Sequence, residues 1–334
     1  MNTLVTAENS ESSESYSLFK QVSDYLQTKI IGQEMLVDRL LIALLADGHL
    51  LVEGAPGLAK TTAIKVLATL LDGDFHRLQF TPDLLPGDLT GTDIYRPETG
   101  DFHFQLGPLF HNLVLADEIN RAPAKVQSAL LEAMGERQIT VGRTTYPLPR
   151  PFLVMATQNP IEQEGTYPLP EAQLDRFLMH INVDYPSADA ERKILQLVRQ
   201  QAEQSFDEAE KPTLQLKREQ IFTAQKQVLA MHMAEPVEEY IVQLVLATRD
   251  PTPYKASLSR MISYGASPRA TIALDRCSRA HAWLKGRDYV SPEDVQAIAH
   301  DVLRHRVLIS FEAEAQGDTA DAIIQEIINL IPVA

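Results

Sequence analysis

The sequence predicts an α/β fold, with a five-stranded parallel sheet flanked by helices and a C-terminal all-helical domain. Short apolar runs alternate with helical patterns in the first half of the chain, which is typical of a parallel sheet covered on both faces. A Gly-rich segment, Gly54–Thr61, joins one of these runs to a helical pattern. Beyond Pro186 the strand-like runs stop and helical periodicity takes over.

Five apolar or mixed runs are short enough to be strands of such a sheet. They are His49–Val52, Phe75–Phe80, Leu113–Ala116, Phe152–Thr157 and Phe177–Val183. Helical patterns accompany them over Gln33–Ala46, Lys60–Leu71 and Ala124–Glu136. In the first pattern Leu36, Leu40 and Leu44 recur every four residues, so they share one face of a helix.

Two polar insertions interrupt this alternation, and each predicts a β-hairpin. Asp93–Gln105 contains a Glu-Thr-Gly-Asp turn between aromatic residues. Gln138–Leu148 alternates around Gly142-Arg143, a two-residue loop suited to a type II′ turn. A hairpin of this kind is either decoration of the core or a functional device, and the residues alone do not separate the two.

The C-terminal part reads as helical from Leu216 onward, after a helix at 188–201 and an acidic linker at 203–212. Ser267 and Ser291 each precede a proline, the pattern of a helix N-cap followed by proline at the first helical position. The predicted parts are a disordered tail, an α/β core and a helical domain, at residues 1–16, 17–205 and 206–334.

Composition excludes some classes of protein and disfavours others. The net charge of −15 disfavours a broad surface for nucleic acid or anionic membrane. The single cysteine, Cys277, rules out an intrachain disulfide and fits a reducing cytosol. The start of the chain, 1–15, lacks the features of a signal peptide, and the richest apolar run, Leu40–Val52, is too short to cross a bilayer. We therefore expect a soluble cytoplasmic protein without direct membrane insertion.

The Gly-rich segment has the composition of a phosphate-binding loop. It comprises Gly54, Ala55, Pro56, Gly57, Leu58, Ala59, Lys60, Thr61 and Thr62. Backbone N–H groups and the positive end of the following helix would bind phosphates, Lys60 would reach the β- and γ-phosphates, and Thr61 would ligate Mg²⁺. Ala59 replaces the second glycine of the strict pattern, which is tolerable if its φ is negative. The alternative is an ordinary strand–turn–helix connection.

Acidic and amide residues follow two of the predicted strands. Asp117 and Glu118 end an apolar run, where Asp117 would hold Mg²⁺ and Glu118 would orient and deprotonate a water molecule. Asn159 follows the next run and would hydrogen-bond that water and a phosphate oxygen. A solvated acidic turn and an Asn-Pro turn are the alternatives.

Two arginines are candidates for stabilising negative charge on a transferred phosphoryl group. Arg176 precedes the last predicted strand, and Arg269 lies in the first turn of the helix capped by Ser267. A surface salt bridge is the alternative for each of them, and the residues alone do not decide.

The chain as a whole resembles a MoxR-type AAA+ ATPase. The blocks that carry the resemblance, in order, are Gly54–Thr61, Phe80–Gly91, Leu115–Pro123, Leu130–Met134, Ala156–Glu162 and Leu174–Phe177. The similarity extends over nearly the whole chain beyond the N-terminal tail. Alanine before the lysine, as at Ala59, is usual in this family, so the departure noted above supports the resemblance.

The resemblance implies a role for each candidate residue. Lys60 and Thr61 would form Walker A, Asp117 and Glu118 Walker B, and Asn159 sensor 1. By the same resemblance, Arg176 is similar to an arginine finger that reaches a neighbouring subunit, Arg269 to sensor 2, and Ile31-Gly32-Gln33 to the segment against adenine. The two hairpins resemble the helix-2 insert and the pre-sensor-1 hairpin, which tend to face the ring pore. Arg121 recurs in the family, but its role is not defined by the sequence.

The function implied is Mg²⁺-dependent ATP hydrolysis by a ring, a homo-hexamer, that remodels or matures a partner protein. Family members often act with a von Willebrand factor A-domain protein. The alternative is a nucleic-acid-handling AAA+ motor, which the charge of −15 and a Gln138–Leu148 hairpin whose sole cation is Arg143 disfavour. A binding switch without turnover is a weaker alternative because it needs no positioned water. A GTPase is weaker still, since no Asn-Lys-x-Asp motif is present.

Overall fold

The computed structural model describes residues 2–160, 165–204 and 214–333. These residues belong to two compact units. The sheet unit consists of Ser17–Leu169 and Ile181–Phe222, and the helical unit of Met1–Tyr16, Pro170–His180 and Thr223–Ala334. The boundary expected between 205 and 206 lies outside the described residues. The segment Pro170–His180, expected in the α/β core, groups instead with the helical unit.

The sheet unit is built on the predicted five-stranded parallel sheet, with strand order β2-β5-β8-β1-β9. The strands are β1 (Leu50–Gly54), β2 (Phe75–Gln79), β5 (Leu113–Asp117), β8 (Leu153–Gln158) and β9 (Met179–Val183). All five predictions are confirmed, with ends that shift by no more than two residues. The register pairs Leu51 of β1 with Ala156 of β8, and Ala116 of β5 with the same Ala156. The carboxyl ends of these three strands therefore meet at one edge of the sheet.

Burial on both faces explains why the central strands read as continuous apolar runs. Leu51, Val52, Leu115, Val154 and Met155 have no solvent exposure. Each such side chain stabilises the fold by roughly 1.5–3 kcal/mol relative to an exposed position.

Helices of the sheet unit accompany the strands as the alternating pattern predicted. They are α2 (Glu34–Leu45), α3 (Lys60–Leu70), α4 (Pro86–Thr90), α5 (Ala124–Glu136) and α7 (Ala188–Gln204), with single 3-10 turns at Pro108–Phe110 and Ile119–Arg121. Leu36, Leu40 and Leu44 of α2 are buried, as their spacing predicted. A further helix, α8 (Arg218–Leu229), begins in the sheet unit and ends in the helical unit.

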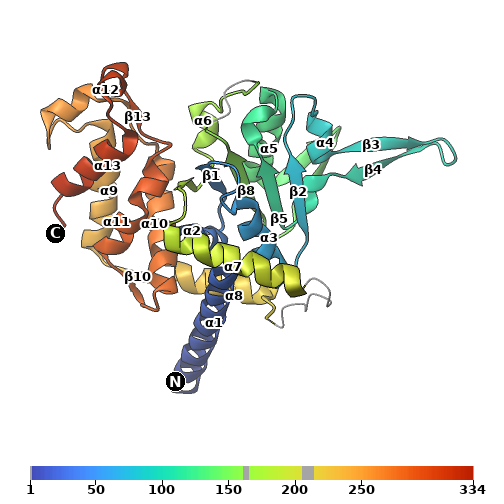
Figure 1. Cartoon of the computed structure of the whole chain (residues 1–334), viewed down its shortest axis with the longest axis horizontal. Coiled ribbons are helices and arrows are strands. Elements are labelled where there is room, and N and C mark those ends of the chain that lie inside the picture. Colours follow the sequence, from blue (N-terminus) through green and yellow to red (C-terminus); the bar gives the residue numbers. More distant parts are fainter. Residues whose placement is uncertain (1, 161–164, 205–213, 334) are drawn as a thin grey trace. The chain divides into compact units, whose positions relative to one another are not determined.

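Both predicted hairpins are present. One pairs β3 (Gly91–Arg96) with β4 (Asp101–Leu106) and projects away from the sheet (Figure 1). The other pairs β6 (Gln138–Val141) with β7 (Thr144–Pro147), and the positive φ of +60° at Gly142 suits its tight turn. The rings of Phe104 and Tyr146 stack 4.2 Å apart and join the two hairpins.

The helical unit contains α6 (Glu171–Leu174), α9 (Glu235–Arg249), α10 (Pro268–Leu284), α11 (Pro292–Leu303), α12 (Phe311–Gln316) and α13 (Ala320–Leu330), with a 3-10 turn at Ala256–Arg260. It also holds two small sheets that the sequence did not predict. They pair β10 (His232–Met233) with β12 (Tyr289–Val290), and β11 (Ile262–Tyr264) with β13 (Leu308–Ile309). Strands of two or three residues carry too little periodicity to be recognised in a sequence.

The predicted helix starts at Ser267 and Ser291 are confirmed. The Ser267 hydroxyl accepts a hydrogen bond from the Arg269 N–H at 3.1 Å. The Ser291 N–H donates to the carboxylate of Asp294 at 2.8 Å, within a capping box.

The disordered tail predicted at 1–16 is wrong for Asn2–Tyr16, because helix α1 extends over Asn2–Lys29. Phe19, Val22 and Leu26 are buried at helical spacing, and this apolar stripe anchors the helix in the sheet unit. A Ser/Glu-rich composition predicts disorder only where no stable helix adjoins the segment.

No helix in the described part of the chain is both long enough and apolar enough to span a bilayer.

A buried histidine links the start of β1 to its neighbours in the sheet unit. His49 Nδ1 accepts a hydrogen bond from the Val154 N–H at 3.0 Å, so Nε2 carries the proton and donates to the Met134 carbonyl at 3.3 Å. The side chain is 4% exposed. Burial, together with the nearby Arg137, lowers the pKa of His49 from 6.5 to about 4. The ring is therefore neutral at pH 7.

We expect His49 to make the fold sensitive to mild acid. The unfolded chain takes up a proton below pH 6.5 while the folded chain resists it until about pH 4, so stability is lost as pH falls across this interval. At pH 5 the free energy of unfolding should be lower by about 2 kcal/mol than at pH 7, a value that follows from the shift of the His49 pKa. Urea unfolding of the parent and of His49→Asn at pH 7 and pH 5 measures this loss. The exposed His103→Asn serves as control. An equal pH dependence in all three proteins would contradict the assignment.

Candidate functional site

The loop Ala55–Ala59 turns the chain from the end of β1 into the start of α3. Two of its residues have left-handed backbone, Gly57 with a φ of +86° and Ala59 with a φ of +58°. The negative φ under which alanine would be tolerable at position 59 is therefore not observed. The chain must reverse from strand to helix within five residues, and Ala59 adopts the left-handed conformation directly before the first helical residue. This conformation costs a non-glycine residue roughly 1–2 kcal/mol.

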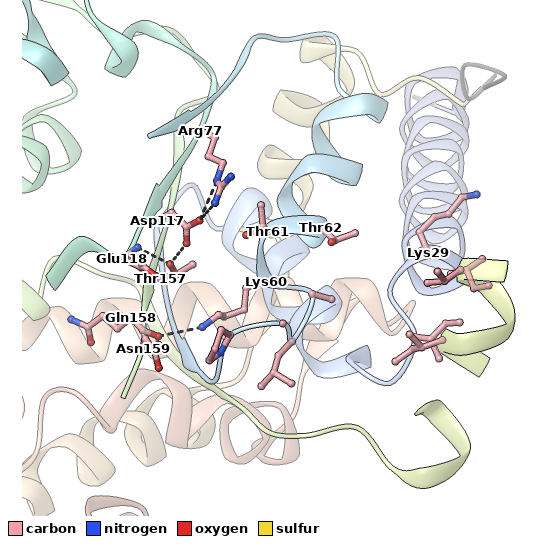
Figure 2. A pocket seen from close by; sticks show the side chains of 18 residues that line it. Lys29, Lys60, Thr61, Thr62, Arg77, Asp117, Glu118, Thr157, Gln158 and Asn159 are labelled. Atoms are coloured by element: carbon pink, nitrogen blue, oxygen red, sulfur yellow. Dashed lines mark hydrogen bonds and ion pairs between the residues drawn. The ribbon is translucent and has the colours of Figure 1, made fainter. Parts of the chain in front are cut away.

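Lys60 lies at the N-terminus of α3 with its side chain turned back toward the sheet. Its ammonium donates to the carbonyl of Gly54 and, at 3.3 Å, to the carbonyl of Gln158 (Figure 2). The residue is 9% exposed, and burial lowers the pKa of the amine, an effect that Asp117, Glu118 and Glu53 oppose. A cation thus lies between the ends of β1 and β8.

Asp117 ends β5 with both carboxylate oxygens engaged. The Thr157 hydroxyl donates to Oδ1 at 2.6 Å, and Arg77 of β2 donates to Oδ2 from Nη2 at 2.6 Å and from Nε at 3.1 Å. Figure 2 shows this chain of contacts across three neighbouring strands. The sequence analysis missed Arg77 and Thr157. The alternation of β2 could have indicated that Arg77 points to the same face as Gln79, but not which acid it meets.

Glu118 leaves the sheet in a left-handed conformation, with a φ of +57°. Its N–H donates to the Thr157 hydroxyl at 3.0 Å. Its carboxylate accepts hydrogen bonds from Gln79 at 2.7 Å and from Arg121 at 3.0 Å. Arg121, whose role the sequence left open, therefore pairs with Glu118 in the same chain. Gln79 was not predicted as a site residue.

One cavity of about 520 Å³ in the sheet unit is lined by Lys60, Arg77, Asp117, Glu118 and Thr157 together with further residues. The predicted residues that it brings together are Ile31, Pro56, Gly57, Leu58, Ala59, Lys60, Thr61, Thr62, Asp117, Glu118 and Asn159. Asn159 is 7% exposed, so only a small part of it faces the cavity. The remaining lining residues were not predicted and are Lys29, Arg77, Thr157, Gln158, Ile194, Leu197 and Val198.

Three predicted loop or segment residues lie elsewhere in the sheet unit. Gly54 and Ala55 line a second cavity of about 320 Å³, together with Asp184 and Tyr185. Gly32 has a φ of +78°, and a side chain there would come within 2.7 Å of Ala190. Its role is thus to let the chain pass close to α7, which carries the apolar lining residues.

Arg176 and Arg269 belong to the helical unit. Arg176 follows the short helix α6, and Arg269 is the second residue of α10. Their action on a ligand in the cavity stays a prediction.

Two oxygen ligands in the lining of the cavity fit a magnesium ion. The Thr61 hydroxyl and the Asp117 carboxylate are hard oxygen ligands, and both line the cavity. Among the residues that the structure describes, no group of three His, Cys, Asp or Glu side chains could hold a metal by itself. Such a pair suits Mg²⁺, which takes one or two protein ligands and completes its shell with phosphates and water.

Comparison with known proteins identifies the family. Residues 49–179 match the ATPase family associated with various cellular activities (AAA), and 255–327 match the AAA lid domain. The chain is 47% identical to Chaperone MoxR1 of Mycobacterium tuberculosis over 306 residues, which cover 90% of this chain and 78% of that protein. The chain belongs to the MoxR-type AAA+ ATPases.

Two further comparisons extend over essentially the whole MoxR-type chain. The uncharacterised protein YeaC of Bacillus subtilis is 42% identical over 95% of both proteins. The crystal structure of a candidate ATPase from Cytophaga hutchinsonii has a TM-score of 0.90 and 44% identity, and covers 99% of both chains. The resemblance inferred from the motifs is confirmed, and membership in this family supports ATP hydrolysis in general.

We expect Ala59→Gly to stabilise the nucleotide-free protein. Glycine removes the left-handed penalty, and its greater freedom in the unfolded chain offsets part of the gain, which leaves about 0.5–1 kcal/mol. Urea unfolding without nucleotide measures the change. Ala68→Gly, in the body of α3, is the matched control and should lose about 1 kcal/mol. Equal losses in both variants would contradict the strain assigned to Ala59.

Proposed function

We propose that this chain hydrolyses ATP with Mg²⁺ in the 520 Å³ cavity and uses the turnover, as a ring, to remodel a partner protein. One observation carries the proposal. Lys60, the adjacent pair Asp117 and Glu118, and Asn159 come from three separate segments and line the same cavity as the Gly-rich loop. An ordinary solvent-exposed turn would have no reason to place a cation, two acids and an amide around one cavity.

At the phosphate end, the first turn of α3 offers backbone N–H groups that have no partner within the helix. Lys60 would exchange its two carbonyl contacts for the β- and γ-phosphates. Thr61 and Asp117 would hold Mg²⁺, which when bound neutralises charge on the phosphate oxygens. Loading the metal on Asp117 requires Arg77 to release Oδ2 or to share it.

Glu118 is proposed as the general base that takes a proton from the attacking water. In the structure its carboxylate is occupied by Gln79 and Arg121. It must leave at least one of these partners to reach a water molecule beside the γ-phosphate. Asn159 would orient that water through its uncharged amide, so that the metal is not perturbed.

Another part of the cavity lining is apolar. It consists of Ile31 and of three aliphatic residues of α7, Ile194, Leu197 and Val198. Aliphatic side chains of this kind suit the faces of a purine base, which fits the proposal that Ile31 packs against adenine.

Arg176 and Arg269 are proposed to act as arginine finger and sensor 2. In this proposal Arg176 serves the site of a neighbouring subunit, which requires a ring, most simply a homo-hexamer. A guanidinium supplied in trans stabilises charge on the transferred phosphoryl group.

The client is proposed to be a protein. The chaperone name of the relative from Mycobacterium tuberculosis supports this class of client, and a von Willebrand factor A-domain protein is the proposed partner.

The net charge of −15 argues against the alternative of a nucleic-acid motor, which DNA-stimulated ATPase activity would favour. A reducing cytoplasm suits the lone buried Cys277. Capture of partners by Glu118→Gln with ATP would identify the client.

We expect Lys60→Ala and Glu118→Gln to separate binding from turnover. Lys60→Ala removes the cation at the phosphates and should weaken binding of a fluorescent ATP analogue. Glu118→Gln should bind with parental affinity but hydrolyse about 10²–10⁴ times more slowly, because the base is lost. Lys65→Ala, an exposed lysine of the same helix, is the control and should behave as the parent. Parental turnover by Glu118→Gln would remove it from the mechanism.

We expect ATPase activity to rise more steeply than linearly with protein concentration, because each site needs a neighbour's Arg176. Arg176→Ala should bind ATP normally and lose about 10³–10⁵ in rate. Phosphate release measured across a dilution series tests both statements. Arg192→Ala, which alters an exposed ion pair on α7, is the control. Specific activity that stays constant down to monomeric protein would exclude a finger in trans.

A further inference from the structure

A single carboxylate in the helical unit connects the backbone beside Arg176 to the helix that carries Arg269. Asp175 Oδ1 accepts a hydrogen bond from Arg306 Nε at 2.7 Å, and Oδ2 accepts one from the Ser267 hydroxyl at 2.8 Å. The same Ser267 oxygen caps α10 by accepting the Arg269 N–H at 3.1 Å. Only one hydroxyl and one carboxylate therefore separate the main chain of Arg176 from that of Arg269.

Arg306 holds the main chain on both sides of Arg176. Its side chain is only 2% exposed. Its guanidinium donates to the carbonyls of Phe177 at 2.6 Å, Leu178 at 3.2 Å and Asp175 at 3.3 Å, and it also donates to Val302 in α11. A planar guanidinium with five donors is suited to this set of acceptors, which a lysine could not serve.

The two residues before Arg306 also donate hydrogen bonds to the main chain of the segment Pro170–His180. Arg304 donates to the His180 carbonyl at 2.6 Å, and His305 Nε2 donates to the Phe177 carbonyl at 3.2 Å. We call Arg304, His305 and Arg306 the C-terminal clamp. These contacts explain why Pro170–His180 groups with the helical unit.

The ion pair between the buried Arg306 and the partly exposed Asp175 is weak support for stability, because desolvation of the charges offsets much of their attraction. The pair has a stronger effect on geometry than on stability. Because the Asp175 carboxylate accepts hydrogen bonds from two donors in fixed directions, the chain around it can adopt few arrangements. The clamp and Asp175 thus fix the main chain of Arg176 to α10 and α11.

We propose that Asp175 is a positioning residue for the arginine finger. Because its carboxylate accepts hydrogen bonds from Ser267 at the start of α10 and from Arg306 after α11, it sets where the main chain of Arg176 lies relative to these two helices. Loss of this carboxylate would misplace Arg176 for the neighbouring subunit. This inference rests on the proposed function, in which Arg176 acts in trans.

The test mixes subunits that are defective in different places. Glu118→Gln subunits cannot hydrolyse ATP but present an intact Arg176. Asp175→Asn subunits keep an intact site but present Arg176 poorly, and alone they should lose about 10²-fold in turnover, the scale of a misplacement of about 1 Å. Mixed rings should regain activity, because Asp175→Asn sites then lie beside intact fingers. Arg176→Ala mixed with Glu118→Gln should regain activity in the same way.

Ser267 provides a second route in case Asp175→Asn does not fold. Ser267→Asp keeps a good N-cap residue for α10 but sets a like charge against Asp175, so it should reproduce the defect and its recovery by Glu118→Gln subunits. Ser267→Thr keeps the hydroxyl and should restore parental turnover. Asp275→Asn, which alters a different Asp–Arg pair of α10, is the control and should remain parental.

The outcomes separate the inference from the proposal beneath it. If Arg176→Ala recovers in mixtures but Asp175→Asn and Ser267→Asp do not, the positioning role of Asp175 is wrong while the finger in trans stands. If Arg176→Ala itself fails to recover, the finger in trans is wrong, and the positioning role is overturned together with it. Thermal unfolding of each variant shows whether the subunits are folded before they are mixed.

Discussion

The hydroxyl of Thr157 is the contact on which the arrangement of the site depends. It donates to the Asp117 carboxylate and accepts the Glu118 N–H, so one buried atom sets both acids relative to the sheet. This is possible because β8 lies between β5 and β1 in a parallel sheet. Thr157 also stands opposite Val52, near the start of the Gly-rich loop. The register of three strands therefore determines the spacing between the loop and the acids.

Local sequence was sufficient for the central sheet, for both hairpins and for the residues that lie in recognisable motifs, but not for the N-terminal part of α1 or for the two small sheets of the helical unit. The strands, both hairpins and the loop with Lys60 followed from periodicity, turn residues and glycine spacing. Arg77, Gln79 and Thr157 did not, because their importance arises from pairing across strands that lie about forty residues apart in the chain. The positive φ of Ala59 could not be obtained from the sequence, because the family pattern shows that alanine is used there but not which backbone conformation it adopts.

The segment Pro170–His180 illustrates a different limit. It follows β8 in the chain and includes the first two residues of β9, so its position in the sequence suggests that it belongs to the sheet core. The hydrogen bonds that decide its place come from Arg304, His305 and Arg306, more than a hundred residues later. Unit boundaries of this kind follow from long-range main-chain contacts, which a composition shift at the acidic linker could not reveal.

The ion pair between Arg77 and Asp117 has a consequence for how metal enters the site. With the guanidinium in place the pair has no net charge, so a bare divalent cation gains little there and would have to displace a bidentate partner. A cation that arrives already chelated by a triphosphate brings its own anions, and these can attract the displaced guanidinium. Under the proposed function, this pair would guard the resting site against adventitious ions in the surrounding medium and would favour the complete metal–nucleotide complex over the bare ion.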